Sequence, residues 1–215
     1  MNLIEKYPYI VIEGPIGSGK TTLSRKFEDK FGVNLLLENA EANPFLPRFY
    51  QDAQRYALPT QLFFLFQRSQ QILDLTQRDM FAKATVADFF LEKDPIFARM
   101  NLDEEEYALY HQIYTHLQLK SPAPDLVIYL QTPVDELMER IEERNVSYEQ
   151  EIPQEYIERL SDAYSEFFHH YESSPLLIVN NEKLNIVKNE EAIDLLVERI
   201  MQIKGRREFF NPNLE

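Results

Sequence analysis

The stretch "YIVIEGPIGSGKTT", residues 9–22, joins an apolar run to a glycine-rich turn, and it decides the fold class. Gly14 to Thr21 fit the pattern of a glycine, four residues of any type, then Gly-Lys-Ser/Thr. Glycines let successive backbone N–H groups approach phosphate oxygens, and a helix that starts near Gly19 directs its positive end at the same anion. The sequence therefore predicts a strand, a phosphate-binding loop and a helix.

The residues of the loop have expected parts in binding a nucleotide. The Lys20 side chain has the length to reach the β and γ phosphates, and the Thr21 hydroxyl is the usual ligand of Mg²⁺ in such loops. We expect the nucleotide to contact the whole loop, which consists of Gly14, Pro15, Ile16, Gly17, Ser18, Gly19, Lys20, Thr21 and Thr22.

The composition narrows the class of partner. A formal net charge of −14 disfavours a surface for nucleic acid or anionic membrane, since both need a basic face. No apolar run approaches the roughly 20 residues of a membrane span, and the first ten residues lack the pattern of a secretion signal. The absence of cysteine excludes disulfides and thiolate metal sites. We expect a cytoplasmic protein without nucleic-acid or membrane partners.

Short apolar runs alternate with longer stretches of helical pattern along the chain. The runs predict buried strands at 9–13, 33–38, 84–88, 125–131 and 176–180. The intervening pattern predicts helices at about 19–31, 58–79, 100–119, 133–144, 153–172 and 189–204. Such alternation favours one α/β domain over residues 1–215, with a five-stranded parallel sheet between two layers of helices.

Polar residues end the predicted strands, where ligands of parallel sheets bind. They are Glu13, Glu38, Asp88, Gln131 and Asn180. Asp88 fits either the acidic residue of a motor-type ATPase or the metal-side carboxylate of a kinase. A GTPase would need Asn-Lys-x-Asp after a late strand, and "NNEKLN" at 180–185 does not supply it. The loop by itself does not name the reaction.

Three longer segments narrow the choice: "LLLENAEANPFLPRFYQDAQRYALPTQLFFLFQR" (35–68), "ADFFLEKDPIFARMNL" (87–102) and "ERIEERNVSYEQEIPQEYIERL" (139–160). In these segments the chain resembles the deoxynucleoside kinase family, and the similarity runs in register over nearly the whole sequence. The resemblance implies the P-loop NTPase type of fold, ATP as phosphate donor, Mg²⁺ and a homodimer.

The resemblance also implies a role for each of five residues around the acceptor. Glu38 matches the general base that takes the proton from the sugar 5′-hydroxyl. Tyr50 and Glu149 match the ligands of the 3′-hydroxyl. Gln61 matches the glutamine that pairs with the base edge, and Arg68 matches an arginine that helps to hold the base. Gln61 and Arg68 are seven residues apart, so a helix presents both on one face.

A lid at about residues 140–152 is implied as well. Arg140 and Arg144 match arginines that close over the transferring phosphate, so that the expected catalytic residues are Glu38, Lys20, Arg140 and Arg144. A separation of four residues places both arginines on one helix face. Phosphoryl transfer depends mostly on positioning and charge stabilisation, which suits these cations.

The match departs from the family after the third strand. Many members carry Glu/Asp-Arg-Ser there, whereas this chain reads Asp88-Phe89-Phe90, in which the acid remains able to hold Mg²⁺ but the arginine is missing. Either Lys93 or Asp94 then faces the base, with Asp94 taken as the substrate-binding residue. The aspartate-aromatic form resembles the bacterial deoxyadenosine and deoxyguanosine kinases more closely.

The sequence therefore predicts an ATP-dependent kinase that phosphorylates the 5′-hydroxyl of a deoxynucleoside, with a purine as base. One alternative is a nucleoside monophosphate kinase such as a thymidylate kinase, which needs no strand-end base because its acceptor is already anionic. Another is a non-catalytic regulator gated by a nucleotide. The long apolar helices near 58–79 and 100–119 favour a two-fold dimer. No role follows for the tail "KGRREFFNPNLE".

Overall fold

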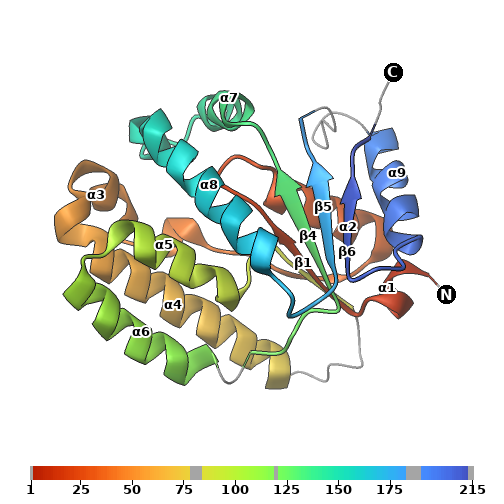
Figure 1. Cartoon of the computed structure of the whole chain (residues 1–215), viewed down its shortest axis with the longest axis horizontal. Coiled ribbons are helices and arrows are strands. Elements are labelled where there is room, and N and C mark those ends of the chain that lie inside the picture. The colour runs from red at the N-terminus through yellow and green to blue at the C-terminus, as the bar shows by residue number, and fades with distance from the viewer. Residues whose placement is uncertain (1, 78–83, 119–120, 183–189, 213–215) are drawn as a thin grey trace.

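The computed structural model describes residues 2–77, 84–118, 121–182 and 190–212. Within them lies one six-stranded sheet, whose neighbouring strands all pair in parallel (Figure 1). The strands, in spatial order, are β2 (Asn34–Leu36), β3 (Thr85–Ala87), β1 (Tyr9–Glu13), β4 (Leu126–Gln131), β5 (Leu176–Asn180) and β6 (Arg207–Phe210). The predicted parallel sheet is confirmed, and the five predicted strands are all present.

The predicted strand count of five is wrong, because β6 adds a sixth strand from within the C-terminal tail. It pairs with β5 through Leu176 to Val179, and Glu208 forms an ion pair with Arg199 of the preceding helix. β6 is only four residues long and two of them are charged, so it lacks the apolar run by which the other strands were predicted. Its pairing with the edge of β5, rather than its own sequence pattern, accounts for this strand.

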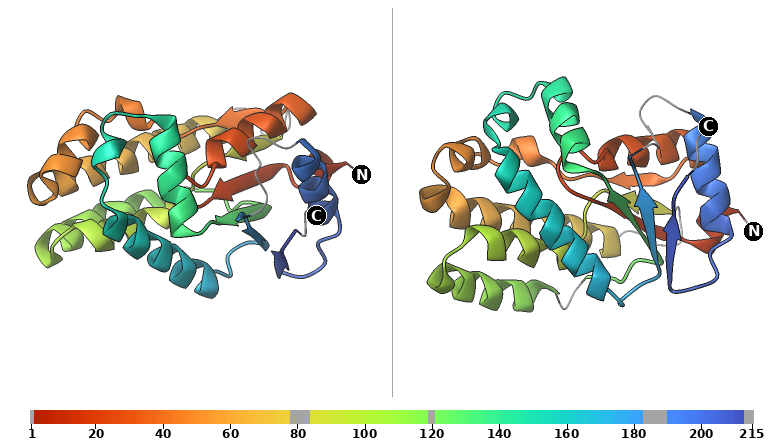
Figure 2. Two further views of the ribbon diagram at one scale, coloured as in Figure 1. Left: turned by 90° about the horizontal axis from the view of Figure 1, so that it is seen from above. Right: turned by 45° about the horizontal axis from the view of Figure 1, so that its top comes forward.

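Helices cover both faces of the sheet, as predicted. One face carries α1 (Leu3–Lys6), α2 (Lys20–Phe31) and α9 (Glu190–Met201), and the other carries α7 (Val134–Arg144) and α8 (Gln154–His170) (Figure 2). Successive side chains of a strand point to opposite faces. Ile10 and Ile12 accordingly join the core under α2 and α9, while Tyr9 and Val11 join the core under α7 and α8.

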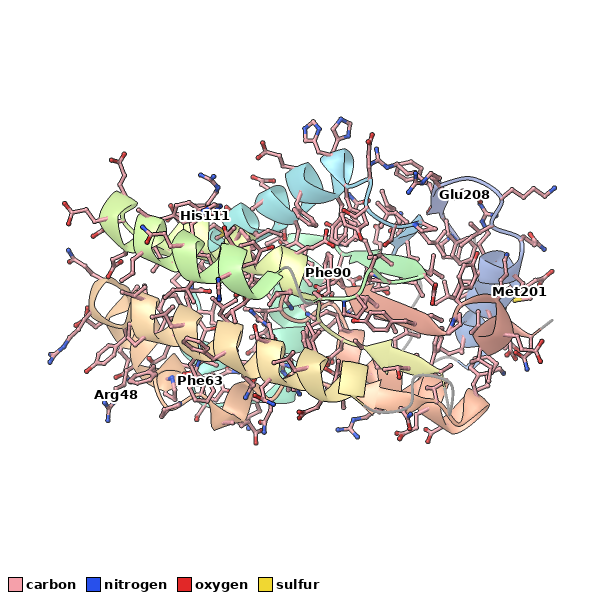
Figure 3. The ribbon with its side chains drawn as sticks, turned by 90° about the horizontal axis from the view of Figure 1, so that it is seen from below. Arg48, Phe63, Phe90, His111, Met201 and Glu208 are labelled. Atoms are coloured by element: carbon pink, nitrogen blue, oxygen red, sulfur yellow. The ribbon has the colours of Figure 1, made fainter. Side chains whose placement is uncertain are left out.

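A further group of helices lies at the end of the molecule remote from β6 (Figure 1). It consists of α3 (Leu46–Gln51), α4 (Ala53–Gln77), α5 (Asp94–Asn101) and α6 (Glu104–Gln118). Its own core includes Leu65 and Ile72 of α4 and Tyr110 of α6. Figure 3 shows Arg48 of α3 and Glu208 of β6 toward opposite ends. Among the residues described here, no helix combines the length and apolarity that crossing a membrane needs.

The helix predicted at 100–119 corresponds to α6, which begins at Glu104, while residues 100 and 101 end the helix α5, which was not predicted. Leu102 is extended, and the Asp103 side chain accepts the backbone N–H of Glu106, which starts a new helix. The helix predicted from 58 begins at Ala53 and continues through Pro59. The predicted boundaries at 79, 119 and 189 lie outside the described residues. The described residues also contain three short 3₁₀ turns: η1 (Ala40–Ala42), η2 (Leu91–Lys93) and η3 (Glu149–Glu151).

Candidate active site

A pocket of about 480 Å³ contains most of the residues that the sequence predicts to be functional. The phosphate loop, the segments after β2 and β3, and helices α3, α4 and α7 contribute its walls. The predicted residues that line it are Ile16, Gly17, Gly19, Lys20, Thr21, Thr22, Glu38, Tyr50, Gln61, Arg68, Asp88, Arg140, Arg144 and Glu149. The fold thus brings these predicted side chains together from segments that are well separated in the chain.

Four of the predicted residues do not line this pocket: Gly14, Pro15, Ser18 and Asp94. Conversely, several lining residues carried no prediction, namely Ala40, Leu46, Phe49, Thr60, Phe97, Glu143 and Tyr156. Phe64 also lines the pocket, with its ring 4.9 Å from the Arg68 guanidinium. Helical periodicity does not signal apolar wall residues, because such a side chain faces a pocket or a core with the same pattern.

The loop after β1 has the backbone geometry that its glycines predict. Gly17 has φ +86°, and a Cβ there would lie 2.8 Å from the carbonyl oxygen of Leu137, so α7 packs directly on the loop. Lys20 Nζ donates to the carbonyl oxygens of Gly14 at 2.7 Å and Pro15 at 3.0 Å. Burial, together with the charge of Lys93, lowers the pKa of Lys20 to about 8.

Asp88, at the end of β3, joins two other parts of the site. Thr21 Oγ1 donates to Asp88 Oδ2 at 2.5 Å, and the backbone N–H of Glu38 donates to Asp88 Oδ1 at 2.7 Å. Burial raises the pKa of Asp88, and the two hydrogen bonds oppose that rise. A hydroxyl and a carboxylate side by side at the pocket are oxygen ligands of the kind that Mg²⁺ prefers.

Glu38 follows β2 and is held by Arg68 of α4. Arg68 Nε donates to Glu38 Oε1 at 2.7 Å, and a second guanidinium nitrogen contacts the same oxygen. The remaining guanidinium nitrogen pairs with Asp94, which is fully buried and accepts the Tyr110 hydroxyl at 3.0 Å. Burial raises the pKa of Glu38, but Arg68 and Lys93 outweigh it and bring the pKa to about 2. Glu38 is therefore a carboxylate at neutral pH.

Lys93 and Asp94, the two alternatives for the residue that faces the base, do not line the pocket. Asp94 pairs with the guanidinium nitrogen of Arg68 that does not contact Glu38. Lys93 Nζ lies 3.1 Å from Glu13 Oε1 and 3.8 Å from Glu38 Oε1, and its side chain is 2% exposed. The buried Glu13 had no predicted role. Its place at the end of an apolar run was evident from the sequence, but its partner was not, and a buried carboxylate needs one.

Gln61 of α4 is 4% exposed and lines the pocket together with Arg68, in line with the prediction that both lie on one helix face. Its Oε1 atom is buried and has no hydrogen-bond partner within the described chain. On another wall, the rings of Tyr50 and Tyr148 stack with centroids 6.3 Å apart, next to Glu149. Burial, together with the charges of Tyr156 and Glu149, raises the pKa of Tyr50.

Both predicted arginines of α7 face the pocket while engaged in ion pairs. Arg140 contacts Glu136 at 2.7 Å and donates to the backbone carbonyl of Asn181 at 3.2 Å. Arg144 contacts Glu149 at 2.5 Å. The Asn181 side chain donates in turn to the backbone carbonyl of Ser18 at 2.8 Å. Asn181 therefore connects the phosphate loop to the helix that carries the arginines, a function that sequence reasoning missed.

This arrangement combines a cradle for phosphate, an ionised carboxylate, a buried amide and cations in one pocket. Comparisons with known proteins agree with such chemistry. The chain is 32% identical over 203 residues to deoxyguanosine kinase of Bacillus subtilis, covering 91% of this chain and 97% of that relative. It is 30% identical over 197 residues to deoxyadenosine kinase of Lactobacillus acidophilus, covering 85% of this chain and 90% of that one.

Solved structures give the same result. A structure of deoxyadenosine kinase from M. mycoides with bound dATP is similar with a TM-score of 0.78 at 28% sequence identity, covering 90% of this chain and 98% of that one. Another structure of that kinase, with the products dCMP and dCDP bound, has a TM-score of 0.79. The sequence model of the deoxynucleoside kinase family matches residues 10–204. Since that match spans most of the sequence, the chain belongs to the deoxynucleoside kinase family and is a phosphotransferase.

Proposed function

We propose that this enzyme transfers the γ-phosphate of ATP to the 5′-hydroxyl of a deoxynucleoside with a purine base, deoxyadenosine or deoxyguanosine. The product, a deoxynucleoside monophosphate, would enter nucleotide salvage. One observation carries the proposal: the Glu38 carboxylate lines the same pocket as the phosphate loop. The names of the relatives, deoxyguanosine and deoxyadenosine kinases, support the class of acceptor.

Glu38 serves in this proposal as the general base. Its Oε1 atom accepts the bonds from Arg68, and its Oε2 atom takes part in no hydrogen bond or ion pair within the part of the chain that the structure describes. A carboxylate that is ionised, held by one oxygen and accessible by the other can accept the proton of a hydroxyl directed at the γ-phosphate. The lowered pKa of Glu38 supports this role, because the base must be unprotonated before transfer.

The acceptor lies between the α4 side of the pocket and the Tyr50 side. Gln61 pairs with the edge of the base, since an amide offers both a donor and an acceptor and can turn to suit either purine. Arg68 contacts the base from the same helix face. Tyr50 and Glu149 bind the 3′-hydroxyl, and their proximity on one wall supports that assignment. Asp94 acts on the base through Arg68.

The phosphates lie in the loop, near Lys20. Arg140 and Arg144 belong to a lid of about residues 140–152 and stabilise charge on the transferring group. Their present carboxylate partners, Glu136 and Glu149, hold them at the pocket before the phosphate competes for them. Thr21 and Asp88 hold Mg²⁺, which supplies charge neutralisation when bound.

We further propose that the enzyme is a cytoplasmic homodimer formed through α4 and α6. These helices lie side by side at one end of the molecule (Figure 1). Phe66 of α4 is 53% exposed and Leu109 of α6 is 48% exposed, which supports an apolar contact there. Sedimentation at micromolar concentration should give the mass of two chains, and a monomer would contradict this assignment.

An acceptor panel tests the reaction. The enzyme is incubated with ATP, Mg²⁺ and one acceptor at a time, chosen from deoxyadenosine, deoxyguanosine, deoxycytidine and thymidine monophosphate. We expect monophosphates from the two purine deoxynucleosides at the highest kcat/KM. Turnover of thymidine monophosphate alone would identify a nucleoside monophosphate kinase. ATP binding without turnover of any acceptor would identify a nucleotide-gated regulator.

A further inference from the structure

Lys93 is a buried cation next to Glu38, and its burial needs an explanation. It ends η2 and precedes α5, and its side chain is 2% exposed. Removing an ammonium group from water is costly, and close opposite charges and hydrogen bonds must offset this cost. Lys93 does not line the pocket, so substrate contact does not explain its burial.

Glu13 fixes the position of this ammonium. Its Oε1 atom receives both Lys93 Nζ and the backbone N–H of Phe90, each at 3.1 Å. Its Oε2 atom accepts the backbone N–H of Gly14 at 3.1 Å and the Tyr164 hydroxyl at 3.2 Å. The carboxylate is thus tied to the start of the phosphate loop, to the segment after β3 and to α8. Lys93 is consequently anchored on one side by a rigid partner.

On its other side, Lys93 faces Glu38 without a hydrogen bond. The separation of 3.8 Å between Lys93 Nζ and Glu38 Oε1 is that of an ion pair that acts through charge. The charged and titratable groups around Glu38 come from several elements and are Arg68, Lys93, Lys20, Asp88, Glu13 and Tyr164. Of the two cations nearest to Glu38, Arg68 lines the pocket and Lys93 does not.

We infer that Lys93 is a positioning residue for phosphoryl transfer, which holds the Glu38 carboxylate toward the acceptor hydroxyl while Arg68 contacts the base. This inference rests on the proposed function, because it assumes that Arg68 turns partly to the substrate. An arginine shared between the base and Glu38 leaves the carboxylate less restrained. A buried ammonium anchored by Glu13 keeps its place throughout the reaction and supplies the missing restraint.

The lack of cysteine in the chain allows a sharp test. The variant Lys93→Cys carries the only thiol and is unfolded, alkylated and refolded. Alkylation with 2-bromoethylamine rebuilds a side chain of lysine length that ends in an ammonium, whereas iodoacetamide gives a neutral side chain of similar size. The wild-type chain passes through both treatments as the control. Circular dichroism and thermal unfolding compare the folded products.

We expect the charged adduct to retain kcat within about threefold of wild type, and the neutral adduct to lose about 10- to 100-fold in kcat. The KM for the deoxynucleoside should stay within about threefold, because Lys93 does not touch it. A neutral adduct with wild-type kcat would overturn the inference. So would a chain that refolds only with the charged adduct, since Lys93 would then serve the fold alone.

A second variant needs no refolding. Glu13→Gln/Lys93→Met removes the buried pair together and leaves no unpaired ion in the interior. It should show the same loss of kcat at unchanged KM, while Lys30→Met, which removes an exposed lysine paired with Asp194, should not. Wild-type kcat in the double variant would again refute the positioning role. Failure of the wild-type enzyme to phosphorylate any acceptor would instead refute the proposed function.

Discussion

Arg68 Nε lies 2.7 Å from Glu38 Oε1, across a separation of 30 residues in sequence. The same guanidinium pairs with the buried Asp94 through another nitrogen. One side chain therefore contacts both Glu38, the expected general base, and a buried acid. In the proposed reaction, recognition of the nucleoside and orientation of Glu38 would therefore share Arg68. Variants of this region should separate the two effects in their kinetic constants.

Glu38→Gln should lower kcat by about 10²- to 10⁴-fold, because the amide cannot take the proton of the 5′-hydroxyl. The Kd for the deoxynucleoside should change by no more than about threefold, since the amide keeps the shape of the side chain. Steady-state kinetics and calorimetry measure the two constants. Glu41→Gln, at an exposed position nearby, is the matched control. Wild-type kcat in Glu38→Gln would exclude Glu38 as the base.

Gln61→Leu should weaken binding of the deoxynucleoside by about 10- to 100-fold, because the base edge would face an apolar group in a buried place. Binding of an ATP analogue should be unaffected. Gln70→Leu changes an exposed glutamine of the same helix, whose side chain bonds to Asp74, and should bind normally. Equal affinities for the nucleoside in both variants would show that Gln61 does not touch the base.

The lowered pKa of Lys20, about 8, predicts a pH dependence of nucleotide binding. Lys20 is a cation below pH 8 and loses its proton as the pH rises through that value, so the affinity for a non-hydrolysable ATP analogue should fall about tenfold between pH 7 and pH 9. Calorimetry across this range measures it. Lys20→Met should bind more weakly and without this step. An identical step in the variant would assign the titration to another group.

Asp88→Asn should raise the Mg²⁺ concentration for half-maximal activity by about tenfold or more, because an amide is a poorer ligand than a carboxylate. Chelation of the metal by EDTA should abolish turnover in the wild-type enzyme. Asp74→Asn alters an exposed aspartate of α4 and serves as the control. An unchanged Mg²⁺ requirement in Asp88→Asn would remove this residue from the metal site.

Deleting residues 207–215 should lower the free energy of unfolding by about 2–4 kcal/mol, since the ladder between β5 and β6 is lost at about 1 kcal/mol per hydrogen bond. The exposed edge of β5 should also promote association. Urea unfolding and light scattering measure these effects. Soluble truncated enzyme should keep its kcat, because no β6 residue lines the pocket. An unchanged unfolding midpoint would show that β6 is dispensable.

The parts of the site that could be predicted depend on local signals. Gly14 to Thr21 form a contiguous motif, and Glu38 and Asp88 end apolar runs, so each position was evident from its neighbours. The assignments to Gln61 and Arg68 needed the resemblance to a family. Most of these residues meet at one pocket.

The remainder depends on contacts between distant segments. Lys93 and Asp94 are adjacent in sequence, yet one pairs with Glu13 and the other with Arg68. No periodic pattern assigns such partners, because they come from different elements. The break between α5 and α6 at Asp103 and the strand β6 were missed for a related reason: a single cap and a short edge strand leave weak traces in composition.

Charges alternate from the buried Glu13 and Lys93 through the half-buried Glu38 to the buried Arg68 and Asp94, and this has a consequence for how the enzyme can change over generations. Replacing Lys93 or Arg68 alone leaves carboxylates without their cation, whereas replacing a cation together with a neighbouring carboxylate removes a whole ion pair. Substitutions at these positions should be inherited in compensating pairs. A laboratory redesign of nucleoside preference should therefore vary Arg68 and Asp94 jointly and select for retained turnover.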